Sequence, residues 1–256
     1  MYSSDELHKN SEIQKIMSLL SVEQKDVDFL STLSIDNLTF LRMKITTAIL
    51  EEQSGVWEPL ARVSKFMPNF LNAKVSEDIL GPKITANITY HVPTKDALGI
   101  ASHFSTKFFC DVLEHIVPER IEHIIRESPN DLMKKVVHEL RKRQNFLLIG
   151  SLIDYTPIPS VHKISLEVDN SEMIQIMDYI TKRERLVELL DFYDDTKILG
   201  LIKASIKLMK MEGLLEVFSY TKSKTKDKVQ KLIQRLSSEE RDIYKLPAQA
   251  FSITIA

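Results

Sequence analysis

The chain has 256 residues, of which 43% are hydrophobic, and this is enough for one extended domain or two small ones with a sizeable core. Its 34 basic and 36 acidic residues nearly cancel, so the whole chain exerts no long-range field that would attract nucleic acid or an anionic membrane. A single cysteine, Cys110, excludes an internal disulfide and a cysteine-rich metal framework, and it fits a reducing compartment.

The first residues do not form a recognisable targeting signal. They are polar and acidic, with no basic flank and no apolar run behind them, unlike a secretory signal. The longest apolar stretches of the chain are also far shorter than the ~20 residues that cross a bilayer. We therefore expect a cytoplasmic protein without membrane insertion.

The spacing of apolar residues predicts helices throughout. They recur three or four positions apart, which is the spacing of one helix face, and the six glycines are isolated from one another. Turns between strands and phosphate-binding loops both depend on glycine, so this scarcity argues against sheets and nucleotide loops. One representative stripe consists of Met173, Ile176, Met177 and Ile180. We expect an all-α fold of short amphipathic helices.

Residues 1–66 predict a helical cap, with helices near 5–19, 22–33 and 36–53. Helix starts are marked where a hydroxyl residue is followed three positions later by Glu or Gln. Both side chains can then accept hydrogen bonds from backbone N–H groups at the start of the helix. This capping-box pattern begins at Ser21, Thr181 and Ser237.

From Pro82 onward the predicted helix boundaries are evenly spaced. They fall near residues 82, 93, 105, 118, 130, 144, 159, 170, 182 and 194, so a pair of helices occupies about 25 residues. The segments that begin at Val92 and Val117 share a Val-Pro start and are 25 residues apart. Short helices with tight corners must fold back on their neighbours. We expect residues 67–221 to form an α-solenoid, a right- or left-handed superhelix.

The last segment, 222–256, predicts a basic helix followed by a tail from residue 246. Its basic residues are Lys222, Lys224, Lys226, Lys228, Lys231 and Arg235. If the tail is ordered, Phe251, Ile253 and Ile255 are expected to pack on a neighbouring helix or on a second subunit, so a homo-oligomer stays open.

The run from Met67 to about Ile202 resembles the superhelical repeats of the N-terminal domain of MgtE magnesium transporters, and the flagellar motor switch protein FliG uses similar units. Two corners are similar to the family's pattern of leucine, two variable residues, proline and an acidic residue. They are Val92-Pro93-Thr94-Lys95-Asp96-Ala97 and Leu113-Glu114-His115-Ile116-Val117-Pro118-Glu119-Arg120. The resemblance implies a helical superhelix used in regulation or assembly.

No functional residue of those families transfers to this chain. The Glu-His-Pro-Gln motif of FliG is absent, although Glu114-His115 and Glu122-His123 begin like it. No transmembrane portion accompanies the repeats, so transport itself is not expected.

Three aspartates form one candidate ion site. Asp191, Asp194 and Asp195 flank Phe192-Tyr193, and carboxylates with several waters are the ligands that magnesium prefers. The alternative is structural, because acidic residues are also favoured where a helix starts.

Two basic clusters form the second candidate. One comprises Lys134, Lys135, Arg141, Lys142 and Arg143, and the other Lys222, Lys224 and Lys228. Either cluster can be a solvated helix face, can dock on an acidic partner or can bind nucleic acid, although few aromatic residues stand nearby for base stacking.

The remaining candidates for chemistry favour structural roles. His91, His103 and His115 are evenly spaced, but antiparallel helices would put His103 at the opposite edge, too far for shared metal binding. Cys110 follows Phe108-Phe109 and is expected to be a buried apolar residue. No hydrolase, zinc-protease, P-loop or dinucleotide motif occurs, so we expect neither an enzyme nor a cofactor.

The sequence therefore favours a non-enzymatic scaffold or regulatory adaptor that binds another macromolecule, most simply a protein. An ion-responsive regulatory domain and a nucleic-acid-binding protein remain the alternatives.

Overall fold

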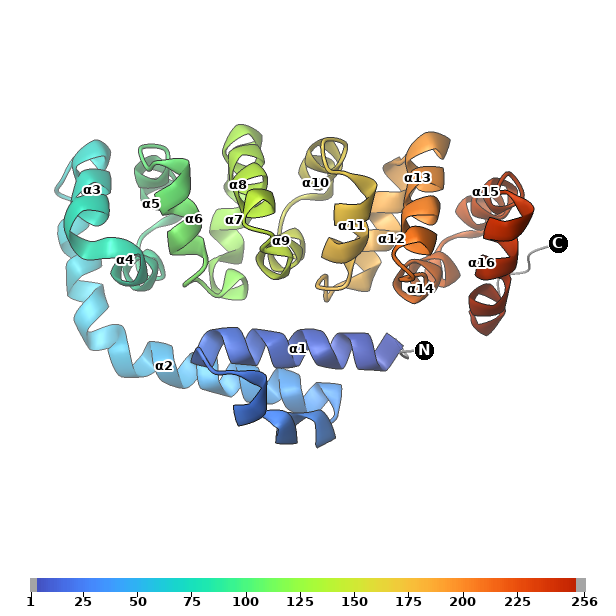
Figure 1. The fold of residues 1–256 in the computed structure, drawn as a ribbon. Coiled ribbons are helices and arrows are strands. Elements are labelled where there is room, and N and C mark those ends of the chain that lie inside the picture. The colour runs from blue at the N-terminus through green and yellow to red at the C-terminus, as the bar shows by residue number, and fades with distance from the viewer. Residues whose placement is uncertain (1–3, 252–256) are drawn as a thin grey trace. The chain divides into compact units, whose positions relative to one another are not determined.

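The structure, a computed structural model, describes residues 4–251, and within that range it is all-helical and contains no strand (Figure 1). The predicted fold class is thereby confirmed. The ten boundaries predicted between residues 82 and 194 each lie within two residues of an observed helix start. None of the helices in the described range is long and apolar enough to cross a membrane.

The chain divides into two compact units. The first unit is Glu12–Thr156, and the second combines Met1–Ser11 with Pro157–Ala256, described here for residues 4–11 and 157–251. Helix α1 (Ser4–Leu20) contributes to both. This division falls elsewhere than the domain boundaries that the sequence predicted at residues 66 and 221.

The first unit holds the helices up to α9. They are the end of α1, the short 3-10 helices η1 (Gln24–Asp26) and η2 (Asp28–Thr32), α2 (Ile35–Ser64), α3 (Asn69–Val75), the π-helical turn η3 (Ser76–Leu80), α4 (Gly81–Thr89), α5 (Thr94–Ala101), α6 (Thr106–Leu113), the 3-10 helix η4 (Pro118–Ile121), α7 (Glu122–Glu127), α8 (Asn130–Lys142) and α9 (Phe146–Ile153).

Helices two apart in the sequence pack on one another in this unit. One row runs through α2, α4, α6 and α8, and the other through α3, α5 and α7, as can be followed in Figure 1. This is the packing pattern of a helical repeat, in which each helix pair buries its apolar face against the next pair. The rows share a core that includes Ala86, Cys110, Val136 and Leu140, all fully buried.

The start of the first unit has its own small core. Ile13, Ile16, Val27, Leu30 and Leu38 are buried together where α1, η2 and α2 meet. The sequence predicted helices here, but the segment predicted as 22–33 forms two 3-10 helices, and α2 extends from the predicted end at residue 53 to Ser64.

The second unit repeats the two-row pattern. Its helices are α10 (Ile158–Ser165), α11 (Asn170–Met177), α12 (Arg183–Phe192), α13 (Asp195–Lys207), α14 (Glu212–Tyr220), α15 (Ser223–Ile233) and α16 (Ser238–Ala250). One row runs through α10, α12, α14 and α16, and the other through α11, α13 and α15. The beginning of α1 is tied to this unit by His8, which accepts a hydrogen bond of 2.6 Å from Nε of the buried Arg183.

An identical close contact occurs once in each unit. A side chain added at Gly99 of α5 would collide with the amide of Asn69, the first residue of α3, and one added at Gly200 of α13 would collide with Asn170, the first residue of α11. Glycine thus leaves room for an asparagine side chain at corresponding places in two rows, and an added Cβ would make that side chain shift. This shared detail supports the repeat interpretation beyond helix spacing alone.

Several local predictions need correction. Ser237 does form a capping box with Glu240, but Ser21 has a positive φ and ends α1, and Lys182 rather than Thr181 precedes α12. The tail was predicted to begin at residue 246, yet α16 continues to Ala250. The predicted packing of Ile253 and Ile255 lies outside the described residues.

Candidate functional site

The basic cluster on α8 contains an internal ion-pair centre. Arg143 donates to Asp111 at 2.6 Å, to Glu114 at 3.2 Å and to Glu139 at 3.2 Å, and its guanidinium also donates to the carbonyl oxygen of Lys107 at 3.1 Å. Burial opposes the charge, but these hydrogen bonds raise the pKa of Arg143. Arg143 therefore joins the end of α8 to α6 and is not a surface residue awaiting a partner.

The other basic residues of this cluster differ in exposure. Lys135 and Lys142 are exposed, whereas Lys134 and Arg141 are half-buried. Lys135 and Lys142 are thus the members of the predicted cluster that α8 exposes most.

The three candidate magnesium ligands have separate structural roles. Asp191 accepts a hydrogen bond of 2.7 Å from the hydroxyl of Thr225, and Asp194 caps α13 by accepting from the backbone N–H of Lys197 at 2.7 Å. Asp195, at the first position of α13, forms ion pairs instead. The helix-start alternative that the sequence left open is the one observed for Asp194.

The ion pairs of Asp195 also account for part of the second basic cluster. Lys228 of α15 lies 3.3 Å from Asp195 and donates to the carbonyl oxygen of Tyr193 at 2.8 Å. Arg235 lies 3.7 Å from the same carboxylate. These contacts pack α15 on α13, so Lys228 serves the fold.

Lys222 and Lys224 are the other members of the second basic cluster. Lys222 is exposed, and the side chain of Lys224 lies outside the described residues. Across the part of the chain that the structure describes, no three His, Cys, Asp or Glu side chains are grouped so as to hold a metal ion.

Cys110 is fully buried in α6, as predicted. Its thiol lies 3.8 Å from the carbonyl oxygen of Val136, and burial raises the pKa of Cys110 to about 12. Because the thiolate is the nucleophile, a thiol held protonated in the core is unreactive at neutral pH.

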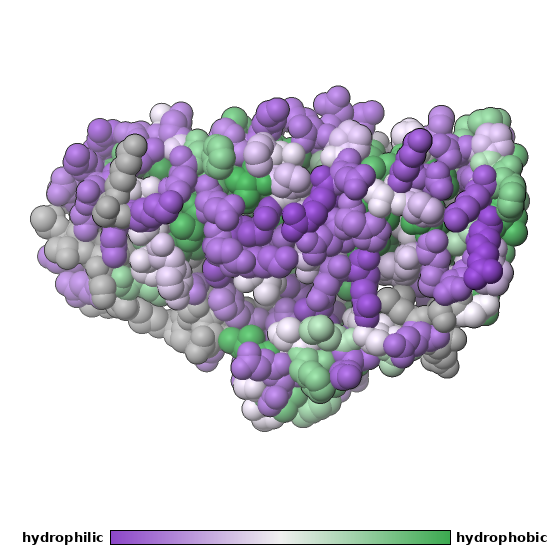
Figure 2. All heavy atoms as spheres, turned by 180° about the vertical axis from the view of Figure 1, so that it is seen from behind, coloured by the Kyte–Doolittle hydropathy of each residue, from purple (hydrophilic) through white to green (hydrophobic). Residues whose placement is uncertain are grey.

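A surface that the sequence did not predict lies where α2 ends and α3 begins. Exposed apolar side chains follow one another from the end of α2 through α3 to η3, and we call five of them the apolar edge: Leu60, Val63, Phe66, Phe70 and Ile79. Phe66 is 89% exposed and Ile79 75%, although both are large apolar residues. Figure 2 shows apolar atoms gathered at the side of the molecule where α3 lies. An exposed apolar cluster of this kind marks an interaction surface.

The sequence did hold a signal for this surface. Val56, Leu60 and Val63 are spaced as one face of a helix, but Gly55 and Pro59 interrupt the pattern. Because α2 packs on α4 and continues to Ser64, these residues share one helical face.

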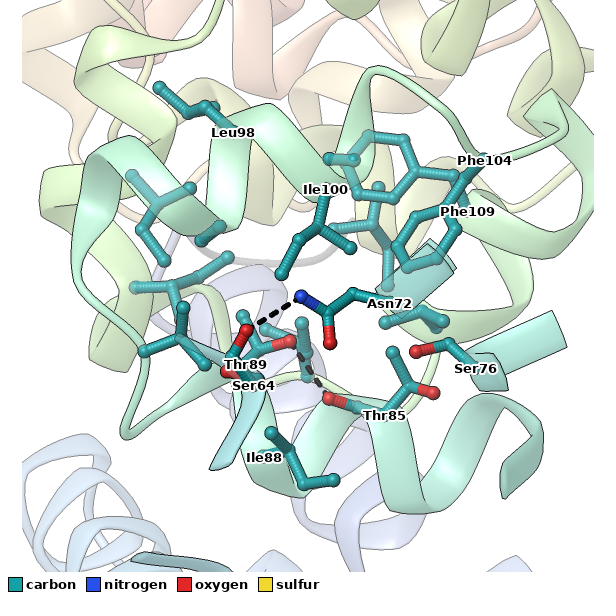
Figure 3. Close-up of a pocket in the computed structure, with 18 of the residues that line it drawn as sticks. Ser64, Asn72, Ser76, Thr85, Ile88, Thr89, Leu98, Ile100, Phe104 and Phe109 are labelled. Carbon is teal, nitrogen blue, oxygen red and sulfur yellow. Dashed lines mark hydrogen bonds between the residues drawn. The ribbon is translucent and has the colours of Figure 1, made fainter. Parts of the chain in front are cut away.

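A second feature of the first unit is a cavity of about 190 Å³ between its two rows. Its lining comes from α2 to α9 and is mostly aliphatic and aromatic (Figure 3). The buried Asn72 of α3 is an exception, and its amide nitrogen donates to the carbonyl oxygens of Ser64 at 2.8 Å and Met67 at 3.1 Å.

Comparisons with known protein families, with curated proteins and with solved structures find no match for this chain.

Proposed function

We propose that this chain is a non-enzymatic scaffold or regulatory adaptor that binds another protein through the apolar edge. The observation that carries the proposal is the exposure of Phe66, Phe70 and Ile79, at 89%, 60% and 75%, on neighbouring segments between the end of α2 and η3. Burial of such side chains against a partner is favourable, at about 25 cal/mol per Å² of apolar surface.

The position of the edge in the repeat favours a helical partner. In its row, α3 packs on α5 on one side, so its other side is the end of the row. Terminal repeats normally carry a polar outer face that stops stacking, whereas α3 exposes Phe70 and Leu71. A partner that supplies an amphipathic helix would continue the row. The role in regulation or assembly implied by the resemblance to MgtE and FliG repeats is in keeping with this proposal.

The matched variants Phe70→Glu and Phe29→Glu test it. Both phenylalanines belong to the first unit and have similar exposure, 60% and 65%, but only Phe70 lies in the apolar edge. We expect a photo-crosslinker at Phe66 to capture one protein at stoichiometric yield. Phe70→Glu should abolish that capture and Phe29→Glu should leave it intact.

Two outcomes would contradict the proposal. Equal capture by both variants would show that the edge is not the docking surface. A cross-link between two copies of the chain, with a dimer mass in light scattering, would assign the edge to self-association instead of a partner protein.

The alternatives have less support. Asp191, Asp194 and Asp195 hold hydrogen bonds and ion pairs within the second unit, and Lys228 is paired with Asp195. No observation on the described residues favours an ion-responsive or nucleic-acid-binding role. The cytoplasmic location stays a prediction.

A further inference from the structure

The cavity of the first unit has two polar groups whose hydrogen-bonding capacity is not used. The hydroxyls of Ser64, Thr85, Thr89 and Ser128 all donate to carbonyl oxygens of their own helices, at 2.7–2.9 Å. The amide oxygen of Asn72 and the hydroxyl of Ser76 have no such partner among the described residues. Asn72 and Ser76 are 6% and 8% exposed, and Figure 3 shows both oxygens pointing into the cavity.

The orientation of the Asn72 amide is fixed by its donor side. Both N–H groups are directed at backbone carbonyls, of Ser64 and Met67, and a flipped amide would place its oxygen against those acceptors. The Asn72 oxygen must therefore face the cavity as an acceptor. As an acceptor in a mostly apolar lining, this oxygen favours a molecule that brings a donor.

The lining also selects against charge. None of the residues that line the cavity is acidic, basic or histidine, so a carboxylate, phosphate or ammonium group would lose its hydration without compensation. Phe104 and Phe109 supply aromatic faces beside aliphatic side chains. The cavity therefore suits a neutral, largely apolar molecule.

The size sets an upper limit on that molecule. An engineered apolar cavity of roughly 150 Å³ binds benzene, so about 190 Å³ has room for an aromatic ring with a short alkyl chain. Entry is available on one side, because Leu60 and Val63 line the cavity and are also exposed at 43% and 57%. The π-helical turn η3 begins at Ser76, and such turns recur at functional sites.

We propose that the first unit binds a neutral alkylphenol-like small molecule in this cavity, with the ligand hydroxyl donating to the amide oxygen of Asn72. The proposal does not depend on a protein partner at the apolar edge. It predicts a specific order of affinities, because a purely apolar cavity prefers a hydrocarbon to a phenol of the same shape, whereas a cavity with an inward acceptor prefers the phenol.

The test compares p-ethylphenol with p-ethyltoluene on the full chain by calorimetry. We expect p-ethylphenol to bind about tenfold tighter, since one satisfied buried hydrogen bond is worth about that factor. Equal affinities, a preference for p-ethyltoluene, or no binding of either compound would overturn the proposal without any variant being made.

A variant that fills the cavity provides a second test of the ligand proposal. Ala101 of α5 lines the cavity, and Ala204 of α13 lies in the second unit, yet both are 7% exposed. Ala101→Leu should abolish binding of p-ethylphenol because the new side chain occupies the cavity, and Ala204→Leu should bind it as the parent chain does. Undiminished binding by a folded Ala101→Leu variant would place the ligand elsewhere.

Discussion

Glu12 shows how one buried charge fixes the start of the first unit. It is 2% exposed and accepts from Nε of Arg42 at 2.8 Å, while Arg42 also donates to Glu119 at 2.8 Å. Lys15 lies 3.2 Å from the same carboxylate. Burial alone would raise the pKa of Glu12, but Lys15 and Arg42 together hold it below its ordinary value. The group thereby ties α1 and α2 to η4.

Glu12→Gln should lower the free energy of unfolding by about 2 kcal/mol at neutral pH, because a buried charge-assisted hydrogen bond is lost. Since the folded-state pKa is lowered, the contribution is present above the ordinary pKa of 4.5 and is lost as the pH falls through the folded value. The difference between parent and variant in urea unfolding should therefore be constant from pH 7 to about 5 and shrink below about 4.

Glu119→Gln provides the control for position. Glu119 is paired with the same Arg42, but its side chain is 35% exposed, so its loss should cost less than about 1 kcal/mol. An equal cost for the two variants, or an effect of Glu12→Gln that persists unchanged in acid, would contradict this account of the pair.

Helix ends are the elements that the sequence predicted least well. Helices α1, α8 and α13 are followed within two residues by left-handed backbones, at Ser21, Gln144 and Met209, with φ of 53–55°. Glycine is the usual residue at such ends, and its absence removed the signal. Starts were easier to predict, because proline or a capping side chain stands in the sequence at most of them, as at Pro93 and Ser105.

Replacement of Gln144 by glycine should stabilise the chain. The backbone N–H of Gln144 donates to the carbonyl oxygen of Arg141 at 2.9 Å, and that of Asn145 donates to the carbonyl oxygen of Leu140 at 3.0 Å. Both hydrogen bonds are kept when the side chain is removed. Left-handed geometry is costly for a residue with a side chain, whereas glycine makes the unfolded chain more flexible and so offsets part of the benefit. We expect the free energy of unfolding, measured in urea, to rise by about 0.5–1 kcal/mol.

Lys142→Gly is the matched control, two residues earlier in α8. Its backbone is helical and its side chain is exposed, so glycine there should cost about 1 kcal/mol. If both glycines destabilised, the left-handed end of α8 would not be a source of strain.

At the scale of the whole molecule, periodicity predicted the repeat but not its ends. Spacing near twelve residues is a local property, and it located the helices from α4 to α13. Which residues stay exposed depends on where each row stops, and this is decided by contacts between segments far apart in sequence. The apolar edge, the cavity and the ion pairs of Arg143 and Asp195 all depend on such contacts, which the sequence pattern does not show.

Row ends should also open first. In the first unit α3 packs on one helix of its row, α5, whereas α5 packs on both α3 and α7. In repeat proteins, stability is the sum of repeat and neighbour terms, so a helix with one neighbour opens at lower free energy than a helix with two. We expect the hydrogen-bonded amides of α5 to exchange with solvent at least about tenfold more slowly than those of α3.

The second unit offers the same comparison between α10, which packs on α12, and α12, which packs on α10 and α14. Hydrogen exchange measured by mass spectrometry should show that the backbone amides of α12 are better protected than those of α10. Uniform protection along a row would mean that its helices open as one cooperative body. In that case the exposed end at α3 would be as rigid as the middle of its row, and its apolar side chains would be presented to a partner without any cost of ordering.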